Sequence, residues 1–154
     1  MTNLVERLNY ELQAITQIID QTQKFYQQFI QDNDSLYEEA LISAIAFNLH
    51  SFYTGIERIF EAIAKQIDQY QPSGSNWHKQ LLTQMIVEVP DIRPGIISAT
   101  TYETLDELRR FRHVVRKIYA YELDPNLILS LAQQSMAIFP VFKQEINSFL
   151  QTLN

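Results

Sequence analysis

The chain has 154 residues, of which 46% are hydrophobic, and its formal net charge is −6. This length suits one domain with its own core, residues 1–154, and the acidic balance excludes a protein that coats nucleic acid indiscriminately. The sequence contains no cysteine, which excludes disulfides, thiolate metal sites and a cysteine nucleophile.

The scarcity of helix breakers predicts an all-α fold. The chain contains only three glycines and five prolines, and long intervals between such residues favour helices. Apolar residues recur at helical steps from Thr2, a candidate N-cap, to about Gln31. Asp32-Asn33-Asp34 then interrupts the pattern. We therefore expect a first helix over residues 2–31.

The second helix is predicted to be long. Ser35 and Glu38 have the spacing of a capping box, and the helical period that follows continues to about Tyr70, with Gly55 in the interior. Residues 71–75 form the clearest loop, because proline, glycine and serine are concentrated there. The first two helices are expected to pack antiparallel.

Three further helices complete the expected bundle of about five. Asn76 is a candidate cap for a shorter helix that ends near Val87, before two prolines. A fourth helix is expected to begin between residues 98 and 101 and to run to about residues 124–125. The last helix spans residues 126 to about 150, and Pro140 should kink it.

The fourth predicted helix contains a cationic segment. Five of the twelve Lys and Arg residues lie between positions 109 and 117. In a helix, Arg109, Arg112 and Arg116 would share an arc of about 60°, where like charges repel unless an anion or an acidic partner compensates them. Apolar residues occupy the opposite side of this helix: Leu108, Phe111, Val114, Val115 and Ile118. A solvated charged face, neutralised in part by ion pairs to residues such as Asp106, is the alternative interpretation.

Two stretches of the sequence resemble HEPN domains, and in particular the HepT-like group. Residues 105–124 resemble the signature helix of that group, and residues 49–60 resemble its long second helix. The resemblance covers essentially the whole chain. It implies a small helical bundle, and members of the group are often encoded beside a minimal nucleotidyltransferase as a toxin–antitoxin pair. It also implies a homodimer, a nucleotidyltransferase partner and an RNA substrate.

The ribonuclease motif of this family is an arginine followed, after four to six residues, by a histidine and often by a tyrosine two positions later. Matched to this chain, Arg112 takes the arginine position and Tyr119 the tyrosine position, but Lys117 occupies the histidine position. His113 does not substitute for the missing histidine, because it directly follows Arg112 and would lie about 100° around the helix from it. Family members are thought to cleave RNA without metal at a cleft between two subunits.

Lys117 leaves two functions open. Histidine titrates near pH 6.5 and lysine near 10.4, so a lysine suits charge stabilisation better than proton exchange at neutral pH. The chain is therefore predicted to be either a metal-independent endoribonuclease that uses Lys117, or a binding module that pairs with a nucleotidyltransferase and does not cut RNA. Candidate phosphate-binding residues are Arg109, Arg116 and His113. A generic helical interaction protein remains if the resemblance is coincidental.

Other residues have supporting roles in this hypothesis. Glu57 and His50 lie seven positions apart, on one face of the second helix, and Glu57 is predicted to orient Arg112 through a buried ion pair or else to be solvated. His78, next to Trp77, is predicted to serve local packing. By the resemblance, Tyr119 is the candidate for attachment of AMP by the nucleotidyltransferase. An ordinary tyrosine at a helix edge is the alternative.

Other classes of protein find no support in the sequence. It contains no glycine-rich phosphate loop, no His-Glu-x-x-His zinc motif and no strand-to-helix serine elbow. The N-terminus lacks a basic stretch followed by an apolar one, and no stretch approaches the roughly 18 apolar residues of a membrane span. We expect a cytoplasmic protein with no metal, no other cofactor and no membrane partner.

Overall fold

A computed structural model describes residues 2–31 and 35–153. Within these ranges the protein is an all-α bundle of five α-helices, as predicted, and the described residues form no β-strand. The helices are α1 (Thr2–Gln31), α2 (Ser35–Ile63), α3 (Trp77–Ile86), α4 (Ala99–Val115) and α5 (Pro125–Gln151). Short π- and 3₁₀-helical turns lie at Ala64–Asp68 and Ala120–Glu122. The predicted interruption at residues 32–34 lies outside the described residues.

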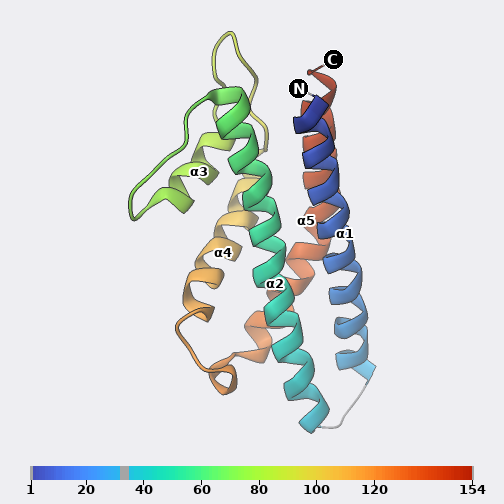
Figure 1. Cartoon of the computed structure of the whole chain (residues 1–154). Helices are drawn as coiled ribbons and strands as arrows, with labels where there is room; N and C mark the ends of the chain where they lie inside the picture. The colour runs from blue at the N-terminus through green and yellow to red at the C-terminus, as the bar shows by residue number, and fades with distance from the viewer. Residues whose placement is uncertain (1, 32–34, 154) are drawn as a thin grey trace.

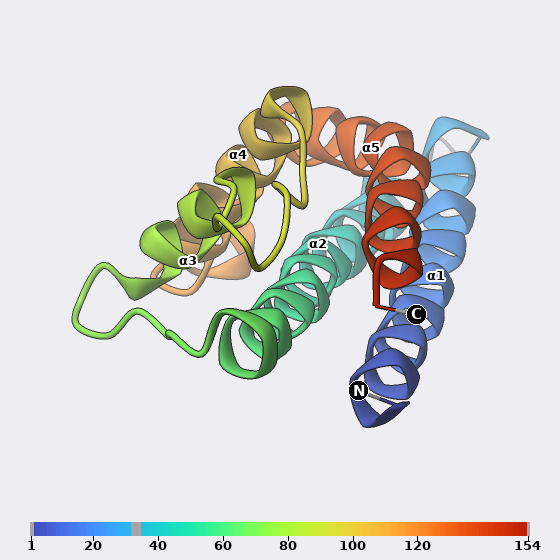
Figure 2. The same cartoon turned by 90° about the horizontal axis from the view of Figure 1, so that it is seen from above.

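Helix α2 occupies the middle of the bundle. It contacts each of the other four α-helices. Helices α1 and α2 run antiparallel, α5 lies beside α1, and α3 and α4 lie on the other side of α2 (Figures 1 and 2). Because α4 begins near the end of α2 and runs back along it, one face of α2 is opposed to the cationic helix (Figure 1).

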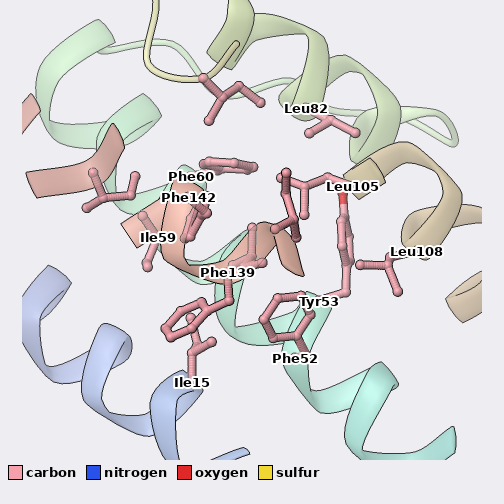
Figure 3. Close-up of a cluster of buried hydrophobic side chains, with 14 of the residues drawn as sticks. Ile15, Phe52, Tyr53, Ile59, Phe60, Leu82, Leu105, Leu108, Phe139 and Phe142 are labelled. Carbon is pink, nitrogen blue, oxygen red and sulfur yellow. The ribbon is translucent and has the colours of Figure 1, made fainter. Parts of the chain in front are cut away.

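The core explains why α2 tolerates an interior glycine. A Cβ atom on Gly55 would lie 2.8 Å from Cγ1 of the fully buried Ile15, so only glycine allows α1 and α2 to approach this closely. Aromatic rings fill the space between α2 and α5. Phe52 packs edge-on against Phe139 at 6.1 Å between ring centroids, and Phe60 packs in the same way against Phe142 at 5.8 Å (Figure 3).

Helix α4 is shorter than the sequence pattern predicts. It ends at Val115, so the prediction of a helix to residue 124 is wrong. The residues after Val115 form other hydrogen bonds in place of a continued helix. The backbone N–H of Tyr119 donates to Oε1 of Glu122 at 3.0 Å. Asp124 caps the start of α5, where its side chain accepts from the N–H of Asn126. Pro125 then occupies the first turn of α5, where its missing N–H costs nothing. The predicted apolar side of α4 is interrupted as well, because the side chain of Val114 is 53% exposed.

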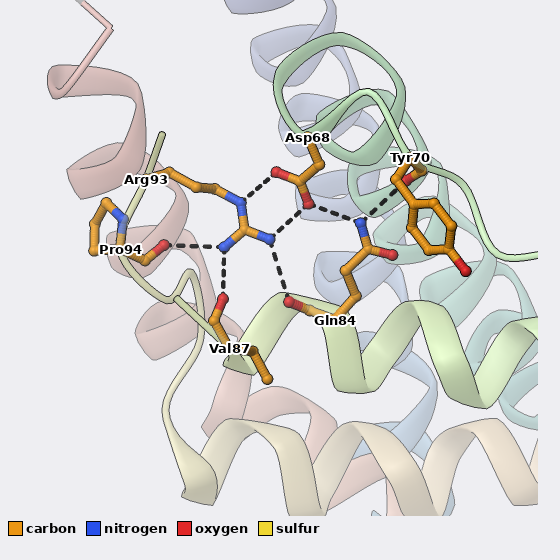
Figure 4. Close-up of polar contacts among 6 residues, drawn as sticks. All are labelled: Asp68, Tyr70, Gln84, Val87, Arg93 and Pro94. Atoms are coloured by element: carbon orange, nitrogen blue, oxygen red, sulfur yellow. Dashed lines mark hydrogen bonds and ion pairs between the residues drawn. The ribbon is translucent and has the colours of Figure 1, made fainter. Parts of the chain in front are cut away.

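The end of α2 also departs from expectation. The α-helix ends at Ile63 and continues as the π-helical turn Ala64–Asp68, after which Gln69 adopts a left-handed backbone with φ of 56°. Asp68 at this turn receives two bonds from the buried Arg93, at 2.6 and 2.7 Å (Figure 4). The prediction of one regular helix to about residue 70 is therefore wrong at its end, because a tertiary ion pair fixes a different turn there.

The predicted cap at Asn76 is wrong, because Asn76 precedes α3 but its side chain makes no capping bond. The other two predicted caps, the side chains of Thr2 and Ser35, lie outside the described residues. The structure adds a cap that was not predicted: Oγ of Ser98 accepts from the N–H of Thr101 at the start of α4, at 3.2 Å. Pro140 lies inside α5, and this helix bends along its length (Figure 2).

Candidate functional site

The candidate site begins with a buried carboxylate between α2 and α4. The side chain of Glu57 in α2 is only 5% exposed, and its Oε1 lies 3.6 Å from Nη1 of Arg112 in α4. The Arg112 side chain is itself 16% exposed. The structure thus brings together the motif arginine and the residue that the sequence suggested as its support, although they are far apart in the chain.

His78 in α3 contacts the other oxygen of the same carboxylate. Its Nδ1 lies 2.7 Å from Oε2 of Glu57, and its ring packs against the ring of Trp77 with 3.7 Å between centroids. The prediction of local packing accounts for the contact with Trp77 but missed the contact with Glu57. No sequence signal could have revealed it, because α2 and α3 meet only through the tertiary fold.

Two more polar side chains of α2 belong to this region. Burial raises the pKa of the Tyr53 hydroxyl above its usual range, and the charge of Glu57 raises it further. The hydroxyl is buried and has no hydrogen-bond partner among the described residues. Burial lowers the pKa of His50 below 6.5, and the positive charges of Arg112 and Arg116 lower it further, so His50 is neutral at neutral pH.

Part of the cationic segment is neutralised within its own helix. Nε of Arg109 donates to Oδ1 of Asp106 at 2.9 Å, and Arg110 lies 3.8 Å from the other oxygen of the same carboxylate. The ion pairs expected between the acidic and basic positions of this helix are thus present at Asp106. Among the residues predicted to bind phosphate, Arg109 is the one whose charge is most engaged within the helix, because it binds Asp106 and its side chain is only 16% exposed.

The remaining cations lie at the exposed end of α4. Arg116 follows the last helical residue, and Lys117 lies in the turn beyond it. Nζ of Lys117 is 3.1 Å from Nε2 of His113, one helical turn earlier. His113 and Lys117 therefore lie within hydrogen-bond distance of each other at this end of the helix.

Tyr119 lies beyond the helix and not at its edge. Its side chain is 70% exposed and that of Tyr121 is 85% exposed. The two rings are nearly parallel, with 5.7 Å between their centroids. Neither ring caps the core, so the alternative interpretation of Tyr119 as a core-capping residue finds no support in its position.

The described residues thus form an all-α bundle in which Glu57 and Arg112 pair near an exposed cationic segment. A family model described as "HepT-like protein" matches residues 44–153, which is well over half of the chain. The chain therefore belongs to the HepT-like family. No curated protein and no solved structure matches it.

Among the described residues, no group of three or more histidine, aspartate and glutamate side chains is placed to hold a metal ion. Over the same residues, no helix combines the length and apolar character needed to cross a bilayer.

Proposed function

We propose that this protein is the HepT-like component of a two-gene toxin–antitoxin module with a minimal nucleotidyltransferase, and that it is a metal-independent endoribonuclease. The observation that supports this function best is Arg112, held from below by the buried Glu57 and close to the exposed His113, Arg116 and Lys117. An arginine that pairs with a carboxylate at 3.6 Å, and not by a hydrogen bond, can also bind a phosphate with its guanidinium.

The proposed reaction transfers the phosphate from the 5′-oxygen of one nucleotide to its neighbour's 2′-oxygen. The RNA 2′-hydroxyl loses a proton and attacks the adjacent phosphorus, and the 5′-oxygen leaves with a proton, which gives a 2′,3′-cyclic phosphate. A lysine ammonium can donate the second proton or stabilise the added negative charge, but it cannot accept the first. To accept the first proton, Nε2 of His113 would have to exchange its contact with Lys117 for one with the 2′-hydroxyl. Arg112 would hold the phosphate, with Arg116 as additional positive charge.

A binding module without nuclease activity is the second candidate. The observation in its favour is Lys117, which stands where the family motif has histidine, in a turn and not on the helix. In that case Arg112 and its neighbours would still bind RNA phosphate or a partner, because phosphate binding needs positive charge and not proton exchange.

We further propose that the protein acts as a homodimer. One α4 offers one Arg112 and one Lys117, and a two-fold axis beside α4 would place two such sets across one cleft. A groove of about 440 Å³ lies beside the end of α4 and the start of α5, and its apolar lining includes Val114, Ile118 and Leu127. Val114 and Leu127 are 53% and 48% exposed, which is apolar surface that a second copy would cover.

Tyr119 is the proposed site of regulation by the partner. Its ring is exposed beyond the end of α4, where an enzyme can reach the hydroxyl. Attachment of AMP there would add bulk and negative charge next to Arg116 and Lys117, which would compete with RNA for the same cations.

Incubation of purified protein with RNA in EDTA tests the nuclease proposal. The wild type should cleave, and Arg112→Ala should slow cleavage by about 100-fold, the usual cost of losing one group that stabilises the transition state. Lys117→His should cleave faster than the wild type, because histidine exchanges protons near neutral pH.

Arg110→Ala is the matched control. It removes one positive charge from the same helix, but the Arg110 side chain is 61% exposed and pairs weakly with Asp106, away from Glu57. It should leave the rate within about twofold of the wild type. Cleavage by Lys117→His alone would identify the binding module, and the absence of cleavage by every variant would refute the enzymatic proposal.

A further inference from the structure

We infer that His78 is a positioning residue for Arg112, and that it acts through the carboxylate of Glu57 that both side chains share. This inference rests on the proposed function, in which Arg112 holds the RNA phosphate. It adds a residue from α3 to a site that the sequence places on α2 and α4 alone.

The two contacts of Glu57 are unequal. His78 Nδ1 lies 2.7 Å from Oε2, which is a short hydrogen bond, whereas Arg112 Nη1 lies 3.6 Å from Oε1, which is an ion pair too long for a hydrogen bond. The Glu57 side chain is 5% exposed, so water does not compete for the carboxylate. His78 therefore fixes the orientation of Glu57, and the interaction between Arg112 and Glu57 is mainly the attraction of their opposite charges.

The guanidinium of Arg112 is left incompletely satisfied by this arrangement. Its Nε is buried and makes no hydrogen bond within the described part of the chain. An arginine and a carboxylate that meet without a competitor adopt a bidentate pair, in which two N–H groups bind the two oxygens. With Glu57 in the orientation that His78 fixes, Arg112 Nη1 comes no closer than 3.6 Å to Oε1, so that Nη1 group is not tied to the carboxylate by a hydrogen bond.

The position of His78 is itself fixed by neighbours in the fold. Its ring packs on Trp77, and α3 is attached to the end of α2 by Gln84, whose Nε2 donates to Oδ2 of Asp68 at 2.7 Å (Figure 4). Nδ1 of His78 is thus presented to Glu57 by a helix that cannot easily move away. Loss of this donor should release Glu57 toward Arg112 and withdraw the guanidinium from RNA.

Two substitutions separate this role from simple packing. In His78→Asn, the side-chain NH₂ occupies about the position of Nδ1 and can still donate to Glu57. In His78→Gln, the donor extends about one bond further, to the position of Nε2, and misses it. Both variants remove the imidazole ring and its contact with Trp77. A difference between them therefore reports the hydrogen bond to Glu57 and not the ring.

Two measurements are made on each variant. The first is the NMR signal of the Arg112 Nε–H group in the protein without RNA, assigned with Arg112→Ala. The second is affinity for a short RNA with 2′-O-methyl groups, which cannot be cleaved. Circular dichroism checks that each variant is folded, and His78→Ala replaces His78→Gln if the latter does not fold, because it also lacks a donor.

We expect His78→Gln to shift the Arg112 Nε–H signal and to weaken RNA binding about tenfold, the loss usual for one charge-assisted hydrogen bond. His78→Asn should stay near the wild type in both measurements. In a Glu57→Gln background the two variants should give the same Arg112 signal, because the shared carboxylate is gone.

Equal signals and equal affinities for His78→Asn and His78→Gln would overturn the inference. Failure of the proposed function looks different: Arg112→Ala would then bind RNA as tightly as the wild type. In that case, the difference between the Arg112 signals of His78→Asn and His78→Gln would still show that His78 positions Arg112.

Discussion

Lys117 is the residue on which the choice between the two proposed functions depends. It occupies the histidine position of the family motif, but the structure places it in a turn, 3.1 Å from the imidazole of His113. Arg112 and His113 both lie within α4, so the helical geometry behind the sequence argument about His113 is present in the structure. His113 and Lys117 meet because they are four positions apart, about one helical turn.

Tyr119 and Tyr121 offer a matched pair for testing regulation. When the protein is co-expressed with a minimal nucleotidyltransferase, intact mass spectrometry should show one added adenylyl group on the wild type. Tyr119→Phe should abolish the addition, because the accepting hydroxyl is gone. Adenylylated protein should bind RNA less tightly, because the added phosphate is negatively charged and lies near Arg116 and Lys117.

Tyr121→Phe is the control for this prediction. Tyr121 is as exposed as Tyr119 and stacks on it, so its substitution removes a similar hydroxyl from the same surface. It should leave the added mass unchanged. Addition to Tyr119→Phe but not to Tyr121→Phe would move the proposed modification to Tyr121.

At the scale of the elements, the turn between α2 and α3 is held by one buried arginine. The Arg93 and Asp68 side chains are 1% and 3% exposed. Arg93 Nη1 also donates to the backbone oxygens of Val87 and Pro94, and Nη2 to that of Gln84 (Figure 4). A single side chain thereby supplies hydrogen bonds to backbone oxygens at both ends of the loop that follows α3. Sequence periodicity does not predict the conformation of this loop.

Removal of this arginine should destabilise the protein strongly. Arg93→Ala leaves the charge of Asp68 buried without its partner, and the free energy of unfolding should fall by about 3–5 kcal/mol in urea titrations followed by circular dichroism. The double variant Arg93→Met, Asp68→Leu should lose less than the sum of its single changes, because no unpaired charge remains.

Arg58→Ala is the surface control, because Arg58 is an exposed arginine on α2. It should change the free energy of unfolding by no more than about 0.5 kcal/mol. A similarly small effect of Arg93→Ala would contradict the view that this ion pair fixes the turn.

At the scale of the whole molecule, a net charge of −6 coexists with a cationic segment at one end of α4. The acidic remainder would repel RNA, so the proposed RNA binding would have to be local, and a dimer would concentrate two cationic segments in one place. Light scattering coupled to size-exclusion chromatography should give twice the chain mass for the wild type.

Val114→Glu should convert that dimer to a folded monomer, because it puts a charge on the exposed apolar surface beside the site. Val87→Glu is its control. Val87 is 52% exposed, but it follows the last residue of α3, away from the end of α4, and its change should leave the dimer intact (Figure 1). A monomeric wild type, or dissociation by both changes, would contradict an interface at Val114.

Part of the candidate site can be predicted from local sequence, and part of it depends on contacts between residues far apart in the chain. The register of Arg112, Lys117 and Tyr119 follows from the resemblance to the family motif, and the shared face of His50 and Glu57 follows from helical geometry. The contact of Glu57 with His78 could not be predicted, because 21 positions and a loop separate the two residues. Their functional roles remain predictions for the experiments above.

The sequence by itself determined the all-α class, the starts of the helices and the place of Gly55 inside α2, because hydrophobic period, caps and breakers are local signals. Only the tertiary structure decided where α2 and α4 end and which side chains share the carboxylate of Glu57. Helix ends depend on competition with neighbouring turns and distant ion pairs, and a buried charge takes whichever partners packing brings to it.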